Sequence, residues 1–200
     1  MKRMLEVSGL AAGVAMVVIG IVAIVLGFSG HNTVVDSIRL ERISGSADMT
    51  PALIREAGKK AGLPESTKYP NCTVAGKAVD SGARARCFAE YMRIHALEAT
   101  GGKVYADMGR YLTVDGKDTN DPDAAAKTPG TGRPVENGLR NLWITETALA
   151  TALNTSHLAE QISVFGIVVG VALLLSGIGF MILAWYTLGG QLFRRKDGAA

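Results

Sequence analysis

Two uncharged apolar stretches dominate the pattern of hydrophobic and polar positions along this chain. The first covers residues 7–28 and the second covers residues 162–188, and neither contains a charged side chain. A helix of about 20 apolar residues is long enough to cross a hydrocarbon core about 30 Å thick. A buried helix of a small soluble domain would usually be shorter and would show a polar face. The pattern therefore predicts two transmembrane helices.

The first stretch has an alternative interpretation as a cleaved signal peptide, because it lies near the N-terminus and follows Lys2 and Arg3. A signal peptide has an apolar region of about 7–15 residues and a cleavage site made of small residues. The apolar region of this chain is longer, and the sequence LGFSGHN that ends it is a poor cleavage site. We therefore expect the first stretch to be retained as a membrane helix.

The basic residues at the two ends predict the orientation. Lys2 and Arg3 precede the first stretch, and Arg194, Arg195 and Lys196 follow the second. Because basic flanks stay in the cytoplasm, we expect residues 1–6 and 189–200 to be cytoplasmic and residues 29–161 to be extracytoplasmic. The protein would then be a two-pass protein of the plasma membrane. Residues 29–161 contain 16 basic and 16 acidic side chains, so the net charge of +3 comes from the ends and does not indicate a nucleic-acid partner.

Both cysteines of the chain, Cys72 and Cys87, lie in this external segment. In an oxidising compartment such a pair is most simply a disulfide. A bridge that closes a loop of about 15 residues would stabilise the fold by roughly 3 kcal/mol. A metal site would require more ligands nearby, and a redox pair is usually closer in sequence.

Two helices are predicted in the first part of the external segment. Thr50 and Pro51 form an N-cap followed by proline at the first helical position, and Gly62 would end this helix. A second helix is predicted over residues 81–99. Its apolar face would carry Phe88, Tyr91, Met92 and His95, which recur at three- and four-residue spacing.

The rest of the external segment is less regular. Residues 103–114 are ambiguous, with Tyr105, Tyr111 and Leu112 as the expected buried members. Residues 115–138 are rich in Gly, Pro, Asp and Thr and should form a flexible loop. Residues 139–161 predict a stalk helix that continues into the second apolar stretch. The expected fold is therefore mainly α, with two transmembrane helices and a small, disulfide-stapled, mostly helical extracytoplasmic domain.

Small residues recur at seven-residue spacing in both apolar stretches. They predict close helix packing, because small side chains let two helix backbones approach in lipid. The alternative is that glycine is simply common in membrane helices. The packing partner could be the other stretch, a second copy or another membrane protein, besides the lipid bilayer itself. The predicted packing residues are Gly9, Gly13, Gly20 and Gly27 in the first stretch, and Ser163, Gly166, Gly170, Gly177 and Ala184 in the second.

The residues give little indication of catalysis. The sequence contains no GxSxG, P-loop, GxGxxG, HExxH or CxxC motif. His31, His157 and Glu160 should lie near the outer membrane face, but their spacing does not require a metal. The apolar stretches also lack the ionisable residues that mark transport pathways. We therefore expect no catalytic residues, no metal and no cofactor.

Two segments resemble a group of small actinobacterial membrane proteins of unknown function. They are residues 98–107 (EATGGKVYAD) and residues 142–149, in which LWIT is followed by Ala148 and Leu149. The group has two spans around an external domain and is often labelled aromatic ring-opening dioxygenase. Together with the final span the resemblance covers about half the chain. It implies the two-span topology and an actinobacterial envelope setting, and it implies no activity and no functional residues.

These observations favour a non-enzymatic accessory or assembly subunit of a bacterial envelope complex. The main alternative is an extracytoplasmic sensor or small-molecule-binding module that signals through the second helix. That alternative requires a pocket near Tyr91, Tyr105 and Tyr111. An enzyme is the third and least favoured class.

Overall fold

The computed structural model describes the backbone of residues 2–196 and the side chains of residues 7–186. The predicted cytoplasmic ends, residues 1–6 and 189–200, therefore lie outside the described side chains. The helices are α1 (Lys2–Leu40), α2 (Pro51–Lys60), α3 (Gly82–Ala99) and α4 (Gly138–Lys196), and the short elements are η1 (Tyr105–Asp107), β1 (Tyr111–Leu112) and β2 (Asp118–Thr119). The chain divides into two compact units, which we call the helix pair (Met1–Val34 with Ala159–Ala200) and the head (Val35–Leu158).

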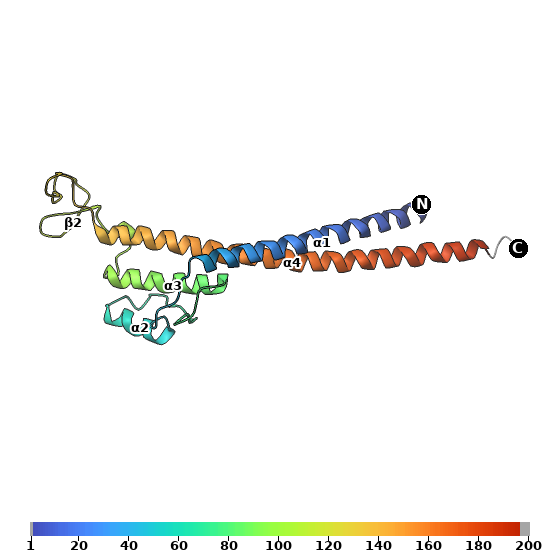
Figure 1. Cartoon of the computed structure of the whole chain (residues 1–200), viewed down its shortest axis with the longest axis horizontal. Helices are drawn as coiled ribbons and strands as arrows, with labels where there is room; N and C mark the ends of the chain where they lie inside the picture. Colours follow the sequence, from blue (N-terminus) through green and yellow to red (C-terminus); the bar gives the residue numbers. More distant parts are fainter. Residues whose placement is uncertain (1, 197–200) are drawn as a thin grey trace. The chain divides into compact units, whose positions relative to one another are not determined.

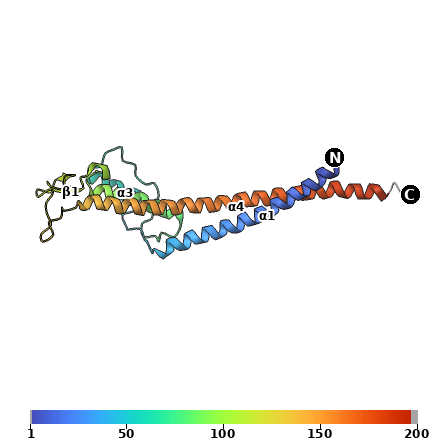
Figure 2. The same cartoon turned by 90° about the horizontal axis from the view of Figure 1, so that it is seen from above.

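Two of the helices, α1 and α4, are long and apolar enough to cross a membrane. In the helix pair they run beside each other (Figure 1), and the second view shows them crossing (Figure 2). Large apolar side chains point away from this contact, and Val18, Leu26 and Phe165 are 55%, 66% and 68% exposed. α1 continues as a helix beyond the predicted first span to Leu40, and the chain becomes extended only near Ser44 and Gly45.

The helices of the head begin where their caps predict. The Thr50 hydroxyl accepts a hydrogen bond from the Leu53 backbone amide, and the Ser81 hydroxyl accepts one from Arg84. These bonds satisfy amide groups that the first turn of a helix leaves unpaired. Gly62, with φ of +74°, follows α2 in the left-handed conformation that glycine adopts readily.

α3 is the central helix of the head. Its residues contact α2 and the loops before it on one side and the first part of α4 on the other (Figure 1). The predicted apolar face was therefore too narrow, because α3 is covered on two sides, while Met92 and His95 are only half-buried. The buried residues of α3 are Gly82, Ala85, Cys87, Phe88, Ala89, Tyr91, Ile94 and Ala96.

A second, smaller cluster joins α3 to α4. Ala96, Met108 and Trp143 are buried together in it. The prediction that Tyr105 is buried was wrong, since its side chain is 43% exposed and lies against the Arg140 guanidinium, 4.2 Å from the ring centre. Met108, which directly follows the 3-10 turn at residues 105–107, is the buried residue instead.

The loop predicted over residues 115–138 is organised by hydrogen bonds. β1 and β2 pair antiparallel with Tyr111 opposite Thr119, and Lys127 forms an isolated bridge with Pro134. Asn137 is buried, and its amide donates to the Gly109 carbonyl at 3.0 Å and to Asp118 at 2.9 Å. A loop with few apolar residues can thus be held together by polar side chains that replace missing backbone partners.

Candidate functional site

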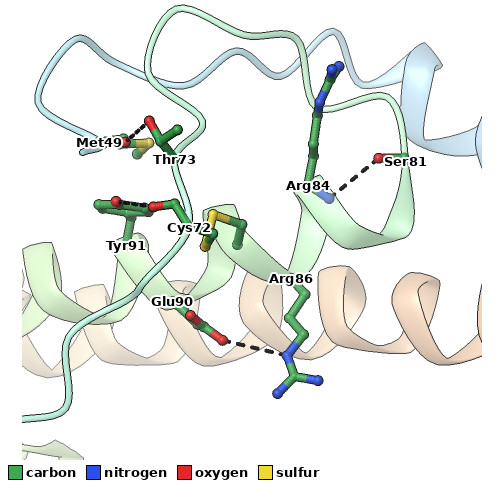
Figure 3. Close-up of a disulfide and its surroundings, with 9 residues drawn as sticks. Met49, Cys72, Thr73, Ser81, Arg84, Arg86, Glu90 and Tyr91 are labelled. Atoms are coloured by element: carbon green, nitrogen blue, oxygen red, sulfur yellow. Dashed lines mark hydrogen bonds and ion pairs between the residues drawn. A yellow bond between two sulfur atoms is a disulfide. The ribbon is translucent and has the colours of Figure 1, made fainter. Parts of the chain in front are cut away.

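The predicted disulfide between Cys72 and Cys87 is present, with an S–S distance of 2.04 Å. It joins the loop before α3 to the helix itself (Figure 3). Two further bonds hold the same loop. The Tyr91 hydroxyl donates to the Cys72 carbonyl at 2.6 Å, and the Thr73 hydroxyl donates to the Met49 carbonyl at 3.2 Å. The loop is therefore fixed at a covalent link and at two hydrogen bonds.

The segment immediately before Cys72, residues 66–71, is fixed to α2. The Arg55 guanidinium donates to the Asn71 side-chain oxygen at 3.0 Å. The ring of Tyr69 lies directly over Gly58, where a methyl group would collide with it. A side chain at this point of α2 would displace the Tyr69 ring from its present position. Residues 66–72 consequently form a firm wall beside α3.

An open cleft of about 1020 Å³ lies between this wall, one face of α3 and His157 of α4. We call it the disulfide cleft. Both cysteines of the bridge line it. Its polar lining residues come from all three elements, so the cleft depends on how these elements pack together. The lining residues are Ser66, Thr67, Lys68, Tyr69, Pro70, Asn71, Cys72, Ala83, Arg86, Cys87, Glu90, Arg93, Ile94, Leu97 and His157.

The disulfide cleft has an excess of cationic groups. Lys68, Arg86 and Arg93 face one carboxylate, Glu90, which pairs with Arg86 at 3.5 Å. Arg93 lies over the Trp143 ring, 5.2 Å from its centre. Such a contact attracts the guanidinium to the face of the ring and restricts its position.

One polar atom of a residue that lines the disulfide cleft has no hydrogen-bond partner. The Nδ1 atom of His157 is buried and makes no hydrogen bond with any residue whose side chain is described. Burying a polar atom without a partner costs about 1–3 kcal/mol. Unpaired polar atoms of this kind are uncommon in folded proteins and call for a ligand, an ion or water.

A smaller hollow of about 300 Å³ lies between α3 and α4, and we call it the stalk hollow. It is lined mainly by carbon, with Met92, Leu142 and Leu149 among its residues. Glu146 also lines it, although this side chain is 4% exposed. Burial raises the pKa of the Glu146 carboxyl, while Arg93 and a hydrogen bond from Thr147 act in the opposite direction.

His95 and Glu98, one turn apart on α3, have different surroundings. The His95 Nε2 atom lies 3.0 Å from the Asp48 carboxylate, which belongs to the loop before α2. The hydrogen bond from Ser46 is the main cause that lowers the pKa of Asp48. Burial raises the pKa of Glu98, and its Oε1 atom has no hydrogen-bond partner among the described side chains. The contact between His95 and Asp48 joins α3 to the loop before α2.

The two other histidines lie in different units. His31 Nδ1 is 3.6 Å from Glu160 Oε1 within the helix pair, whereas His157 lines the disulfide cleft of the head. Among the described residues, no three His, Cys, Asp or Glu side chains are grouped closely enough to hold a metal ion.

The small residues of the two apolar stretches face each other within the chain. Gly13 lies against Gly177 and Gly20 against Gly170, with the two helices antiparallel. A methyl group placed on Gly20 would lie 2.7 Å from the Gly170 carbonyl oxygen, and one placed on Gly170 would lie 2.7 Å from the Gly20 oxygen. This approach is closer than real side chains allow, so bulkier residues would force the helices apart.

The remaining predicted packing residues differ in how closely they contact the opposite helix. Gly27 lies against the Ser163 carbonyl, and Ala184 is buried. A methyl group placed on Gly166 would lie 3.9 Å from the Ala23 carbonyl oxygen. A methyl group placed on Gly9 would have no neighbour within 4 Å. The seven-residue sets thus describe the contact better than the two GxxxG pairs do.

The tyrosines that the binding hypothesis relied on do not share a pocket. Tyr91 is fully buried and bonded to Cys72, whereas Tyr105 lines a separate hollow with Arg140. Sequence reasoning missed Lys68, Arg86, Arg93 and His157 as a group, because they come from three separate segments. One part of the cleft could have been found from the sequence. Successive residues at three- and four-residue spacing place the α3 side of the cleft on one helix face, and they are Ala83, Cys87, Glu90, Ile94 and Leu97.

Comparisons with protein-family models, with curated proteins and with solved structures find no match for this chain. The candidate site is therefore defined by its own geometry.

Proposed function

We propose that this chain is a two-span membrane protein whose head lies outside the cytoplasm and binds a small molecule in the disulfide cleft. Three features support the placement. The apolar helices are long enough to cross a membrane. Basic residues flank these helices on the side of the chain termini, which favours a cytoplasmic location for the termini. The head contains a disulfide, and disulfides persist in oxidising compartments. The function is binding without catalysis, since the two thiols that line the cleft are oxidised and cannot act as nucleophiles.

The disulfide cleft is the observation that carries this proposal. Its volume of about 1020 Å³ lies at the upper end of the range of small-molecule sites. Such sites combine an apolar lining with a few placed polar groups, and here Ile94 and Leu97 alternate with Arg93 and Glu90 along α3. α4 contributes His157 to the cleft and continues as the second apolar helix. A ligand that shifts this part of α4 would therefore act on a helix that enters the membrane.

Filling the cleft tests this function. The full chain is extracted gently from its own membranes, and native mass spectrometry records molecules that remain bound. The wild type should carry a small-molecule adduct that Ala83→Trp loses, since Ala83 is exposed and lines the cleft. The control Ala52→Trp places the same bulk on α2, away from the cleft, and should keep the adduct. An adduct that both variants retain, or none in any sample, would refute the binding function.

An accessory subunit of an envelope complex is the second candidate. The small-residue faces no longer favour it, because in this chain they contact each other. The observation that does favour it is the apolar lining of the stalk hollow, with Leu139 and Ile144 also 45% and 53% exposed on the same part of α4. The same native extraction separates the two candidates. This one expects a protein partner that the double variant Leu139→Gln and Ile144→Gln loses.

A further inference from the structure

We propose that the ligand of the disulfide cleft carries a phosphate group that Lys68 and Arg86 bind, with Arg93 adding to the positive charge of the cleft. This inference rests on the proposed binding function and adds the chemical class of the ligand. Its first support is the local charge. The segment between the apolar stretches is neutral overall, with 16 basic and 16 acidic residues, yet three cations face a single carboxylate in the cleft. The excess is therefore a property of this site.

The cationic groups are partly positioned before any ligand binds. Arg93 is held over Trp143, and the indole nitrogen of Trp143 donates to the Lys103 carbonyl at 2.8 Å. Arg86 is directed along α3 by its ion pair with Glu90 (Figure 3). A guanidinium that is already fixed loses less freedom when it binds an oxyanion, which increases affinity.

One further cation, Lys68, is free to bind. Lys68 is exposed and forms no ion pair among the side chains at residues 7–186. The unpaired Nδ1 atom of His157 is covered by the protein and therefore does not face the phosphate. A phosphate has several acceptor oxygens and can accept hydrogen bonds from lysine and arginine together.

The rest of the lining favours a ligand that is apolar beside its phosphate. Pro70 and Ile94 are buried residues that line the cleft, and Leu97 extends this carbon surface along α3. His157 precedes the apolar stretch of α4 by five residues, which corresponds to about 7.5 Å of helix. A phospholipid headgroup would supply both chemistries, and a soluble phosphate ester would supply the phosphate alone.

The test titrates the full chain in a maltoside micelle, which contains no phosphate, with three probes. These are dioleoyl phosphatidylglycerol, the matching dioleoylglycerol without phosphate, and glycerol 3-phosphate. Native mass spectrometry and calorimetry measure affinity. We expect phosphatidylglycerol to bind at least about tenfold more tightly than dioleoylglycerol, because its phosphate accepts charge-assisted hydrogen bonds that dioleoylglycerol cannot accept. If glycerol 3-phosphate binds as tightly as the lipid, the ligand is a soluble phosphate ester.

Two double variants, which each remove two positive charges, test whether the phosphate binds in the disulfide cleft. Lys68→Gln with Arg86→Gln should weaken binding of the tighter phosphate probe at least about tenfold. Lys59→Gln with Lys60→Gln, at exposed positions of α2 outside the cleft, should leave it unchanged. All four side chains are on the surface, and thermal melting checks that each variant is folded.

Equal loss in both double variants, or no preference for a phosphate-bearing probe, would overturn the inference. The proposed binding function would still stand in that case if the Ala83→Trp variant lost its native adduct. A missing preference for phosphate and a missing native adduct are therefore separate results.

Discussion

The helix pair and the head of this protein are built with opposite distributions of large and small side chains. In the helix pair the contact is made by glycines such as Gly20 and Gly170, and large residues such as Leu26 and Phe165 point outward. In the head the largest side chains, Tyr91 and Trp143, are inside, and charged residues cover the surface. One helix, α4, takes part in both arrangements.

The difference follows from the surroundings that each unit is suited to. Lipid gives apolar side chains no reason to leave the surface, so helices gain most by close backbone contact through small residues. Water drives large apolar side chains inward, and their polar atoms then require partners. Tyr91 and Trp143 meet this requirement by donating to the carbonyls of Cys72 and Lys103. The head also has a covalent link, which the helix pair does not need.

The largest expected effect is loss of the disulfide. Cys72→Ser and Cys87→Ser should each lower the free energy of unfolding of the head by roughly 3 kcal/mol, since the bridge closes a loop with a sequence separation of 15. The double variant should cost little more than either single one, because both remove the same bond. Thermal unfolding of the full chain measures this. Reductant should destabilise the wild type and leave the double variant unaffected, and additive losses would show that the cysteines stabilise the head separately.

Bulky residues at the contact should separate the two apolar helices. In Gly20→Ile and Gly170→Ile, the new Cβ atom would lie only 2.7 Å from the carbonyl oxygen of the opposite helix. Overpacking of this kind costs about 1–3 kcal/mol. Spin labels at Val22→Cys and Val168→Cys, both on outward faces, report the distance between α1 and α4. The distance should widen in the glycine variants. It should stay constant in Ala11→Ile and Ala172→Ile, which add the same bulk at exposed positions.

Removing the hydrogen bond of a buried tyrosine should lower the stability of the head by a smaller amount. Tyr91→Phe removes the donor to the Cys72 carbonyl at 2.6 Å and should destabilise the head by about 1 kcal/mol. Tyr105→Phe is the matched control, because its ring is 43% exposed, and should leave the melting temperature unchanged. Equal melting temperatures for the two variants would show that the Tyr91 hydroxyl contributes nothing to the fold of the loop.

The smallest effect concerns pH. Burial raises the pKa of Glu146 above its ordinary value of 4.5, so the folded head holds this proton more tightly than the unfolded chain does. The resulting stability is present below pH 4.5 and is lost as the pH rises through the raised pKa. Glu146→Gln should therefore be more stable than the wild type at neutral pH, with the difference vanishing in acid. Glu56→Gln, exposed on α2, should show no such trend in melting temperature.

Local signals predicted much of the fold. Thr50, Pro51 and Ser81 located the starts of α2 and α3, because capping depends on residues close in sequence. The disulfide followed from a count of two cysteines. The position of Tyr105 was predicted wrongly, because its exposure depends on Arg140, which is distant in sequence.

The candidate site could not be predicted in the same way. The disulfide cleft lies between residues 66–72, α3 and His157, and no periodic pattern connects these segments. Glu146 lies within the predicted stalk helix, and no local signal indicates that it is buried against α3. Such features depend on how segments distant in sequence pack together, which local propensities do not encode.

The central claim is that two membrane spans anchor a head on the outer side, and thiol labelling in intact cells tests it most directly. The native cysteines are both in the disulfide, so single cysteines can be introduced as Leu5→Cys, Val114→Cys and Asp197→Cys. Val114 is 92% exposed in the head. An impermeant maleimide should label position 114 in intact cells and positions 5 and 197 only after lysis. Labelling of position 5 or 197 in intact cells, or protection of position 114, would contradict the account.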